Sequence, residues 1–341
     1  MKLFVVGSDK IYAIENFYVK YLRENGVEVF HFTAQTSFYD YYQKNLLNKL
    51  VFKSGLSGIL NSINQKFKHS VTAFKPDVIW IFKGMEIFPG SLQWAKDRHI
   101  KLVNYNADNP FIFTGKGSGN KNVTRSIPLF DMHLTYNTAV KKEMESFYGI
   151  PTEILPFGFD IDGALFEKCI QQQEILKACF LGNPDPSRAL FLEHLAAGGI
   201  AIDVFGNDWE KFVRHPNIFT HSPVYGDELW LTLHRYRVQL NLMRLHNPDT
   251  HNMRSFELPG VGAIQLAPDT IDHQTYFEPG KEIFVYNDVA DCIVQINKLL
   301  CLPANEAAVI RYNARQRSLN SGYQYRDRAV QALQLIQKQL G

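Results

Sequence analysis

Cysteine is scarce in this sequence and follows no pattern. The 341 residues include four cysteines, and none of them stands in a CxxC pair or in the spacing of metal ligands. No apolar run approaches the roughly 20 residues that cross a bilayer, and the start, MKLFVVGSDK, has too short an apolar stretch for a secretory signal. These absences argue against a disulfide scaffold, a metal–thiolate site and a membrane span. We therefore expect a cytoplasmic protein with reduced thiols.

Charge is also sparse, and it is unevenly divided. Charged residues make up 21% of the chain and hydrophobic residues 45%, as in folded globular proteins. A chain of 341 residues suits two α/β domains. The net charge is +2, but residues 1–157 hold 19 basic against 13 acidic side chains, whereas the remainder holds 17 against 21. We expect the two halves to face different partners.

The first half alternates apolar strands with amphipathic helices. The expected strands are residues 3–6, 27–32, 78–82 and 102–105, with helices at 14–22 and 92–98 and one long helical region at 39–74. Strands separated by helices form a parallel sheet with right-handed crossovers.

The pattern ends in a proline-containing strand and turn at 153–160 and then restarts. The expected strands of the second half are residues 178–181, 201–205, 238–242 and 263–267, with helices at 188–197, 228–235 and about 326–338. The sequence therefore predicts an α/β fold of two domains, residues 1–157 and 158–322, followed by a carboxyl-terminal segment, 323–341. Ligands of such sheets lie outside the carboxyl ends of the strands.

Residues 249–288 hold the most informative pattern. An acid is followed by a helix start with Arg254 and Glu257, then by a glycine-rich turn and an apolar strand. Backbone N–H groups at a helix N-terminus, next to a carboxylate, can hold a nucleotide diphosphate.

Several short motifs occur in a characteristic order. They are KPDVIW at 75–80, Lys83-Gly84, ADNP at 107–110, LPFGFD at 155–160, FLG at 180–182 with Arg188, VFGNDW at 204–209, LNL at 240–242, RSFE at 254–257 and FEPGKE at 277–282. This order resembles that of glycosyltransferases of the GT-B architecture, and within them most closely the family of the spore-maturation protein CgeB.

The resemblance implies both a fold and an activity. Two Rossmann-like domains would turn their parallel sheets toward each other across a cleft, and the last helix would cross back onto the first domain. The second domain would hold a nucleotide-diphosphate sugar as co-substrate. The first would hold the acceptor, which is a hydroxyl of a glycan, a lipid-linked saccharide or a protein, as in polysaccharide biosynthesis. No metal or other cofactor is expected.

On the donor side, the resemblance gives Glu257 the ribose hydroxyls. Asp249 stands eight residues earlier, where the family pattern has a second Glu close to the donor sugar, and it is one methylene shorter. The alternative for Glu257 is an acid favoured by the helix dipole.

Arg188 and Arg254 are expected to bind the diphosphate, because arginine offers planar multidentate donors. The backbone amides of Asn252, Met253 and Arg254 would share that load. The alternative for either arginine is a solvated surface position.

The nucleotide base is expected where further strands end on the same rim. The residues concerned are Gly182, Gly206, Asn207, Trp209 and Tyr225. The alternative for Trp209 is packing in the core or between domains.

On the acceptor side, polar residues follow the strands of the first half: Ser8, Asp9, Lys83, Glu86, Asp108 and Asn109. Asp108 is the candidate general base for an acceptor hydroxyl, or else an Asx-type turn residue before Pro110. His251 and His273 lie in donor-side loops, where a lone histidine is usually structural.

The span 41–75 contains six lysines and no acidic residue, and its leucines share a helical face. A basic amphipathic helix can lie on an anionic membrane, which predicts a peripheral contact at the inner face of the membrane. The alternative is a domain helix with solvated lysines.

Two other functions remain open from the sequence. One is a nucleotide-sugar 2-epimerase of similar fold, and the other is a non-catalytic sugar-binding or structural protein. No contact with nucleic acid is expected.

Overall fold

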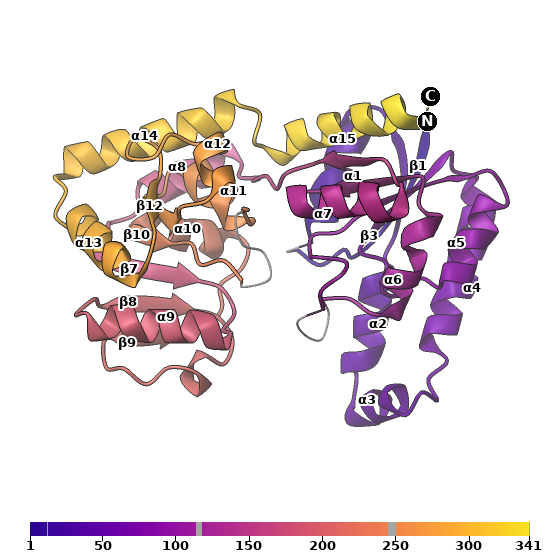
Figure 1. Cartoon of the computed structure of the whole chain (residues 1–341), viewed down its shortest axis with the longest axis horizontal. Coiled ribbons are helices and arrows are strands. Elements are labelled where there is room, and N and C mark those ends of the chain that lie inside the picture. The colour runs from indigo at the N-terminus through magenta and orange to yellow at the C-terminus, as the bar shows by residue number, and fades with distance from the viewer. Residues whose placement is uncertain (12, 114–117, 245–249, 341) are drawn as a thin grey trace. The chain divides into compact units, whose positions relative to one another are not determined.

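The computed structural model describes residues 1–11, 13–113, 118–244 and 250–340. The chain forms two compact units, one of Met1–Pro156 with Tyr325–Gly341 and one of Phe157–Gln324 (Figure 1). Each unit is built on a six-stranded parallel sheet. The predicted α/β architecture of two parallel sheets is confirmed.

The first unit has the strand order β2-β1-β3-β4-β5-β6. Its strands are β1 (Lys2–Val6), β2 (Glu28–Phe32), β3 (Val78–Phe82), β4 (Lys101–Tyr105), β5 (Met132–Thr135) and β6 (Thr152–Ile154). Its helices are α1 (Ile14–Glu24), α2 (Ala34–Gln43), α3 (Leu46–Lys53), α4 (Ile59–Phe74), α5 (Pro89–Lys96), α6 (Lys121–Ser126), α7 (Thr138–Glu143) and α15 (Tyr325–Leu340), with a π-helical turn at Met144–Tyr148.

The core of the first unit forms around β1 and β3. All five residues of β3 are buried, as expected for a central parallel strand covered on both faces by helices. The carboxyl-terminal helix α15 belongs to this core. The ring of Tyr325 stacks on Phe17 of α1 at 4.7 Å between centroids and meets Tyr18 edge-on at 5.6 Å. The predicted return of the last helix to the first unit is confirmed.

The region expected to be helical at 39–74 is helical, with two interruptions. It forms the three helices α2, α3 and α4. Asn45 caps α3 by accepting a hydrogen bond from the backbone N–H of Asn48 at 2.8 Å, and Gly55 has φ +79°, which stops a helix. The apolar periodicity of the sequence continues across these breaks, so the sequence analysis did not detect them.

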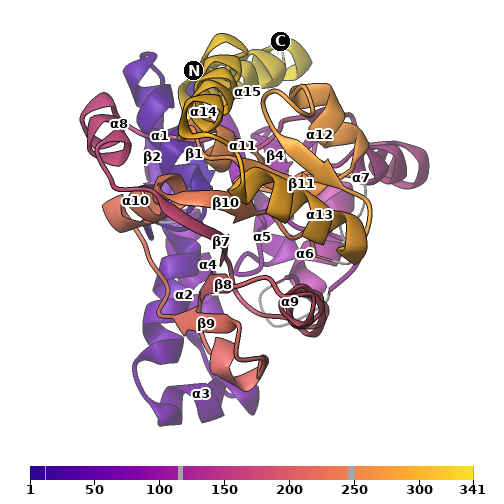
Figure 2. The ribbon, with the colours of Figure 1, turned by 90° about the vertical axis from the view of Figure 1, so that its left-hand side faces the viewer.

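The second unit has the strand order β12-β11-β10-β7-β8-β9. Its strands are β7 (Ile175–Leu181), β8 (Ile202–Phe205), β9 (Ile218–His221), β10 (Tyr236–Leu240), β11 (Gln265–Pro268) and β12 (Phe284–Tyr286). Its helices are α8 (Gly163–Ile170), α9 (Pro186–Ala197), α10 (Asp227–Arg235), α11 (Arg254–Gly260), α12 (Ile271–Tyr276), α13 (Val289–Leu300) and α14 (Ala304–Asn320). Helices α8 and α10 pack together on one side of the sheet, and α9 and α13 on the other (Figure 2).

Within the described ranges, no single helix is long and apolar enough to cross a membrane. Helices α13 and α14 reach that length and hydropathy only as a pair bent by 113°. Both bury residues in the core of the second unit, including Ile296 and Ile310.

A buried ion triad closes the amino-terminal edge of the second sheet. The carboxylate of Glu174, just before β7, accepts hydrogen bonds from Arg237 of β10 at 2.5 and 2.8 Å and from Arg311 of α14 at 2.9 Å. The side chain of Arg237 is 3% exposed. Removing one partner of such a group leaves buried charge without compensation.

We expect Glu174→Ala to lower the free energy of unfolding by about 3 kcal/mol, because Arg237 and Arg311 would lose their counterion. Urea denaturation measures this change. The matched control is Glu278→Ala, which breaks an exposed pair with Lys281 and is expected to cost less than about 1 kcal/mol. Equal losses in both variants would contradict a structural role for the triad.

Candidate functional site

The strand order of the second sheet reverses between the neighbouring strands β7 and β10. At such a switch point the loops leave in opposite directions and open a crevice for a ligand. Arg188, in the first turn of α9, lies at this point. Its guanidinium donates to the carbonyl of Asn183, after β7, at 3.1 Å, and to that of Leu242, after β10, at 2.7 Å. It therefore fastens the two loops that border the crevice.

Asp185 caps α9 and fixes the backbone of Arg188. Its carboxylate accepts hydrogen bonds from the backbone N–H groups of Ser187 and Arg188 at 3.1 and 3.0 Å. The N-terminus of α9 is thus already occupied by an anion of the chain, and Arg188 acts through its side chain.

Three arginines concentrate positive charge at this edge of the second sheet: Arg188, Arg244 and Arg254, here called the arginine cluster. Burial lowers the pKa of Arg188 to about 10, and the charges of Arg244 and Arg254 act in the same direction against the pull of Asp185. The guanidinium is still protonated at neutral pH. Arg244, in the loop after β10, was missed by the sequence analysis, because it stands in a polar stretch without a motif.

Arg254 and Glu257 form an ion pair on α11. The Nη1 of Arg254 bonds to Oε2 of Glu257, and its Nε lies 3.5 Å from the carbonyl oxygen of Leu181 at the end of β7. The side chain of Glu257 is 7% exposed and that of Arg254 25%. Arg254 is therefore not a solvated surface residue. Glu257 does lie in the first turn of α11, so its alternative as an acid favoured by the helix dipole stays open.

The backbone at the start of α11 differs from the expected phosphate cradle. The amide of Asn252 donates to Oγ of Ser255 at 3.1 Å, and α11 has only seven residues. Of the three amides expected to bind phosphate, those of Met253 and Arg254 remain as candidates. Asp249 lies outside the described residues.

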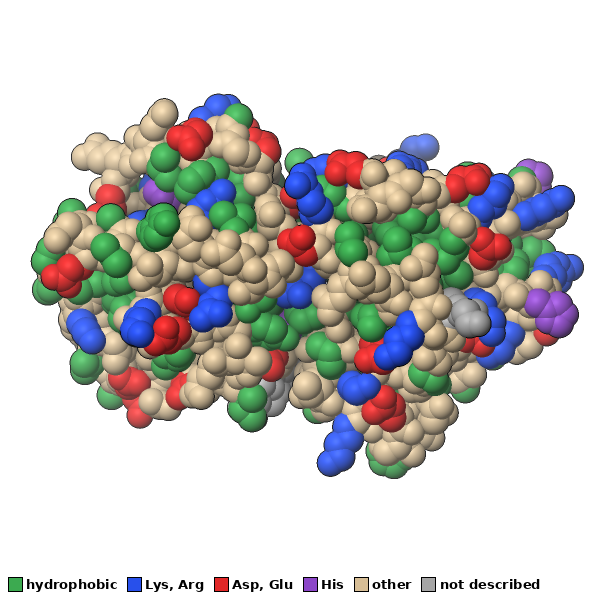
Figure 3. Space-filling model, turned by 90° about the horizontal axis from the view of Figure 1, so that it is seen from above, with side chains coloured by type: hydrophobic (Ala, Val, Ile, Leu, Met, Phe, Trp, Pro, Cys, Tyr) green, Lys and Arg blue, Asp and Glu red, His purple; other side chains and the backbone are tan. Residues whose placement is uncertain are grey.

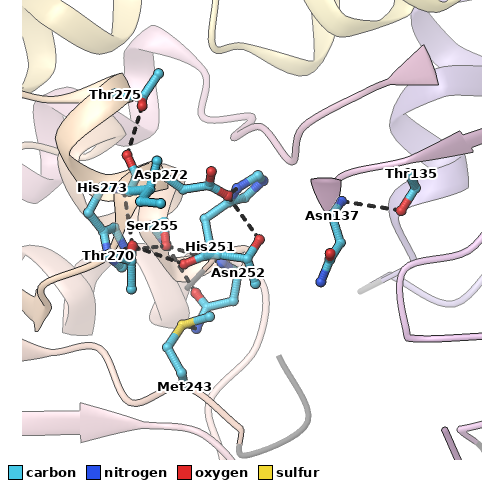
Figure 4. Close-up of polar contacts among 12 residues, drawn as sticks. Thr135, Asn137, Met243, His251, Asn252, Ser255, Thr270, Asp272, His273 and Thr275 are labelled. Atoms are coloured by element: carbon cyan, nitrogen blue, oxygen red, sulfur yellow. Dashed lines mark hydrogen bonds and ion pairs between the residues drawn. The ribbon is translucent and has the colours of Figure 1, made fainter. Parts of the chain in front are cut away.

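A buried polar network holds the loop before α11 (Figure 4). The Oγ of Ser255 bonds to Nε2 of His273 at 2.9 Å and accepts from Asn241 at 3.1 Å, while Asn252 donates to Asn241 at 2.7 Å. Burial lowers the pKa of His273 to about 4. The ring is therefore neutral at neutral pH and supports the network through its hydrogen bonds. The network positions Arg254 and Glu257.

His251 takes part in the same support. Its Nδ1 lies 2.7 Å from the carboxylate of Asp272 on α12, and its ring is 1% exposed. Both histidines therefore occupy the structural position that is usual for a lone histidine.

The residues expected around the base divide into two groups. Trp209 is fully buried and donates from Nε1 to the carbonyl of Gly182 at 2.8 Å. A Cβ on Gly206 would lie 2.3 Å from that same carbonyl oxygen, so this glycine is required by close packing. Trp209 belongs to the core, the alternative weighed from the sequence. Asn207 and Tyr225 are exposed and could contact a ligand.

The first sheet has its own switch point, between β1 and β3. Lys83 follows β3 with φ +61° and pairs with Asp108, after β4, at 2.5 Å between Nζ and Oδ2. The Asx turns in this loop are made by Asn106, which accepts from the amide of Asp108 at 3.0 Å, and by Asn109, which accepts from the amide of Phe111 at 2.9 Å. The carboxylate of Asp108 serves the ion pair instead.

Two buried carboxyl groups lie close to Lys83. Burial raises the pKa of Glu15 to about 7, although the backbone amide of Ser8 donates to it at 2.5 Å. Burial likewise raises the pKa of Glu86 to about 7, with Lys83 opposing the shift and Glu15 adding to it. Asp9 is tied to α2, since its Oδ1 accepts from Thr36 at 2.6 Å.

Glu15 was missed by the sequence analysis, since an acid in the first turn of a helix is ordinary there. The feature that marks Glu15 as a candidate is its burial against the turn that follows β1. Over the part of the chain that the structure describes, no three His, Cys, Asp or Glu side chains gather as metal ligands.

Residues 188–334 match the model of the family described as glycosyl transferase-like. This part of the chain is similar to glycosyl transferases, and the whole chain has a GT-B fold. The match contains the whole arginine cluster together with Glu257, and it confirms the resemblance carried by the motifs. No curated protein matches the sequence significantly.

Solved structures share the fold of this chain over almost its full length. Sucrose-phosphate synthase from Thermosynechococcus elongatus has a TM-score of 0.70 at 12% identity and covers 99% of this chain and 98% of its own. HepE from Anabaena, in complex with UDP, has a TM-score of 0.62 at 14% identity and covers 99% of both chains. A putative UDP-N-acetylglucosamine 2-epimerase from Listeria monocytogenes has a TM-score of 0.57 at 10% identity, covering 98% of this chain and 95% of its own. At these identities the likeness establishes the fold alone.

The buried carboxyl groups generate a prediction about how the stability of the protein depends on pH. The pKa of Glu86 is about 7 in the folded state and near 4.5 when unfolded, so the folded state binds the extra proton between these values. Its contribution to stability is present below about pH 4.5 and is lost as the pH rises to about 7. Relative to wild type, Glu86→Gln should gain stability across this window, by up to about 1.4 kcal/mol per pH unit.

Denaturation at a series of pH values measures the difference between variant and wild type. Comparing the difference, not the wild-type curve, removes the contribution of buried histidines such as His133, whose lowered pKa acts in the opposite direction. Glu28→Gln, on an exposed side chain that pairs with Lys2, is the control and should give a constant difference. A constant difference for Glu86→Gln would contradict a protonated buried carboxyl group.

Proposed function

We propose that this chain transfers a sugar from a UDP-sugar to a hydroxyl group of a glycan, a lipid-linked saccharide or a protein, without a metal ion. The observation that carries the proposal is the arginine cluster at the switch point of the second sheet. When the bond between the anomeric carbon and the diphosphate breaks, negative charge develops on the diphosphate. These guanidinium groups would stabilise that charge. Fixed cations aimed at a developing charge lower the barrier without reorganisation.

The donor is proposed as a UDP-sugar on two grounds. HepE, which shares the fold, has been solved with UDP and with UDP-glucose. In this chain, Glu257 is held by Arg254 and supplies carboxylate oxygens, which accept hydrogen bonds from the ribose hydroxyls. Arg254 keeps its remaining N–H groups for the phosphates. Asn207 and Tyr225, as exposed residues of the same rim, are proposed to border the base.

The acceptor is proposed to bind in the first unit, beside Lys83. A hydroxyl group that attacks the anomeric carbon must lose its proton to a base. Asp108 can take it once its carboxylate leaves Lys83. Glu86, with a pKa raised by burial to about 7, is a second candidate, because a base works best when its pKa is near the working pH.

Metal independence follows if arginines supply all the charge on the diphosphate side. We expect donor turnover to be unchanged after dialysis against EDTA. A loss of turnover that Mg²⁺ or Mn²⁺ restores would contradict this part of the proposal and leave the transferase activity standing.

Arg254→Ala is expected to lower kcat/KM for UDP-sugar turnover by about a hundredfold or more, the usual loss when one stabilising donor at a developing charge is removed. Glu257→Ala should mainly raise KM for the donor, since ribose contacts are made equally in the ground and transition states. Release of UDP from UDP-glucose and UDP-N-acetylglucosamine measures both effects.

Arg214→Ala, on an exposed arginine of the same unit, is the control and should keep wild-type turnover. Unchanged turnover in the Arg254 and Glu257 variants would end the assignment of the donor site. Formation of a C2 epimer without release of UDP would instead favour the epimerase alternative.

A further inference from the structure

Helix α3 exposes its apolar side chains to an unusual degree. None of its eight residues is buried. Leu46, Leu47 and Leu50 are 76%, 66% and 62% exposed, and Leu56, just beyond the helix, is 82% exposed. These four residues are here called the leucine face. In Figures 1 and 2, α3 lies at the lower end of the first unit, beyond the ends of α2 and α4.

The helix is nevertheless held in a defined orientation. The ring of Phe52 packs against Phe38 and Tyr42 of α2, at 4.9 and 5.7 Å between centroids. Asn45 caps its first turn. Because Phe52 anchors the opposite side to α2, the leucine face is presented outward by a folded support.

The charge around the leucine face has one sign. From residue 41 to residue 76 there is no Asp or Glu, and the span holds six lysines. Lys44, Lys49 and Lys53 lie on or next to α3 itself. On the side of each unit that Figure 3 shows, by contrast, acidic and basic side chains are interspersed.

We infer that α3 and the residues flanking it dock onto an anionic lipid bilayer. The leucine face would enter the boundary between headgroups and acyl chains, and the lysines would contact the anionic headgroups. Exposed leucines beside lysines, on a short amphipathic helix, are the pattern of interfacial anchors. A second copy of this chain is disfavoured, because it would bring Lys44, Lys49 and Lys53 against the same three lysines. This inference is independent of the proposed function.

Sedimentation of the full chain with lipid vesicles tests the inference. Binding is expected to vesicles that contain phosphatidylglycerol and not to vesicles of phosphatidylcholine alone, and it should weaken as salt is added. Leu47→Glu with Leu50→Glu should reduce binding at least about tenfold, since both buried apolar area and charge attraction are lost. Leu190→Glu, at a leucine of α9 that is 58% exposed, is the matched control and should bind like wild type.

A second variant separates charge from apolar contact. Lys44→Gln, Lys49→Gln and Lys53→Gln together should weaken binding and flatten its salt dependence, while the leucine face remains intact. The circular dichroism spectrum reports whether each variant is folded. Release of UDP from a soluble UDP-sugar, measured separately, should also be unchanged in all of them.

Three outcomes would overturn the inference. They are no binding of the wild type to either kind of vesicle, equal binding of the wild type and the Leu47/Leu50 variant, and a dimer in light scattering that the Leu47/Leu50 variant breaks. None of them bears on the donor site, because UDP release is measured separately.

Discussion

The second unit of this molecule depends on one largely buried cation, Arg188, whose side chain is 11% exposed. The guanidinium of Arg188 bonds to the carbonyl groups of Asn183 and Leu242, so it joins the loops after β7 and β10. Two of its nitrogens donate to these carbonyl oxygens, and its Nε lies 3.5 Å from Oδ2 of Asp185, which caps α9 through Oδ1. Asp185 therefore offsets part of the charge of Arg188, and Arg244 and Arg254 add positive charge beside it. Low exposure to water strengthens the attraction of such a group for an anion.

Parallel topology explains why such groups gather without being close in sequence. In a sheet whose order reverses, the carboxyl ends of the two central strands border one crevice. In the second sheet these strands are β7 and β10, which bring together Arg188 and Arg244. In the first sheet they are β1 and β3, which bring together the turn at Ser8, with Glu15 against it, and Lys83. Each unit thus repeats the same constraint with opposite chemistry: cations in one, and buried carboxyl groups with a lysine in the other.

The sequence predicted the features that depend on local patterns. Strand β3 is an apolar run between a proline and a lysine-glycine turn, and Arg188 and Arg254 follow strand ends, so their positions were foreseeable. Three features were not. Arg244 stands in a loop without a pattern. Glu15 is buried against the turn that follows β1, a contact that sequence does not reveal. The breaks around α3 are local caps inside a periodic apolar stretch. Trp209 was expected to bind the base, because a sequence does not reveal close packing. The absence of a Cβ at Gly206 lets the Trp209 ring approach Gly182 and donate to its carbonyl group.

The pairing of Arg254 with Glu257 decides how the donor charge is shared. A carboxylate next to a diphosphate would repel it if it were not neutralised, yet ribose hydroxyls need an acceptor of this kind. The ion pair resolves the conflict, because Arg254 cancels the charge of Glu257 and leaves its oxygens able to accept hydrogen bonds. In the proposed mode of donor binding, Arg188 and Arg244 supply net positive charge to the diphosphate, and Arg254 contributes hydrogen bonds from its remaining N–H groups. Since the polar network of Ser255, His273 and Asn241 is buried and its histidine is neutral, this division of charge does not vary with pH near neutrality.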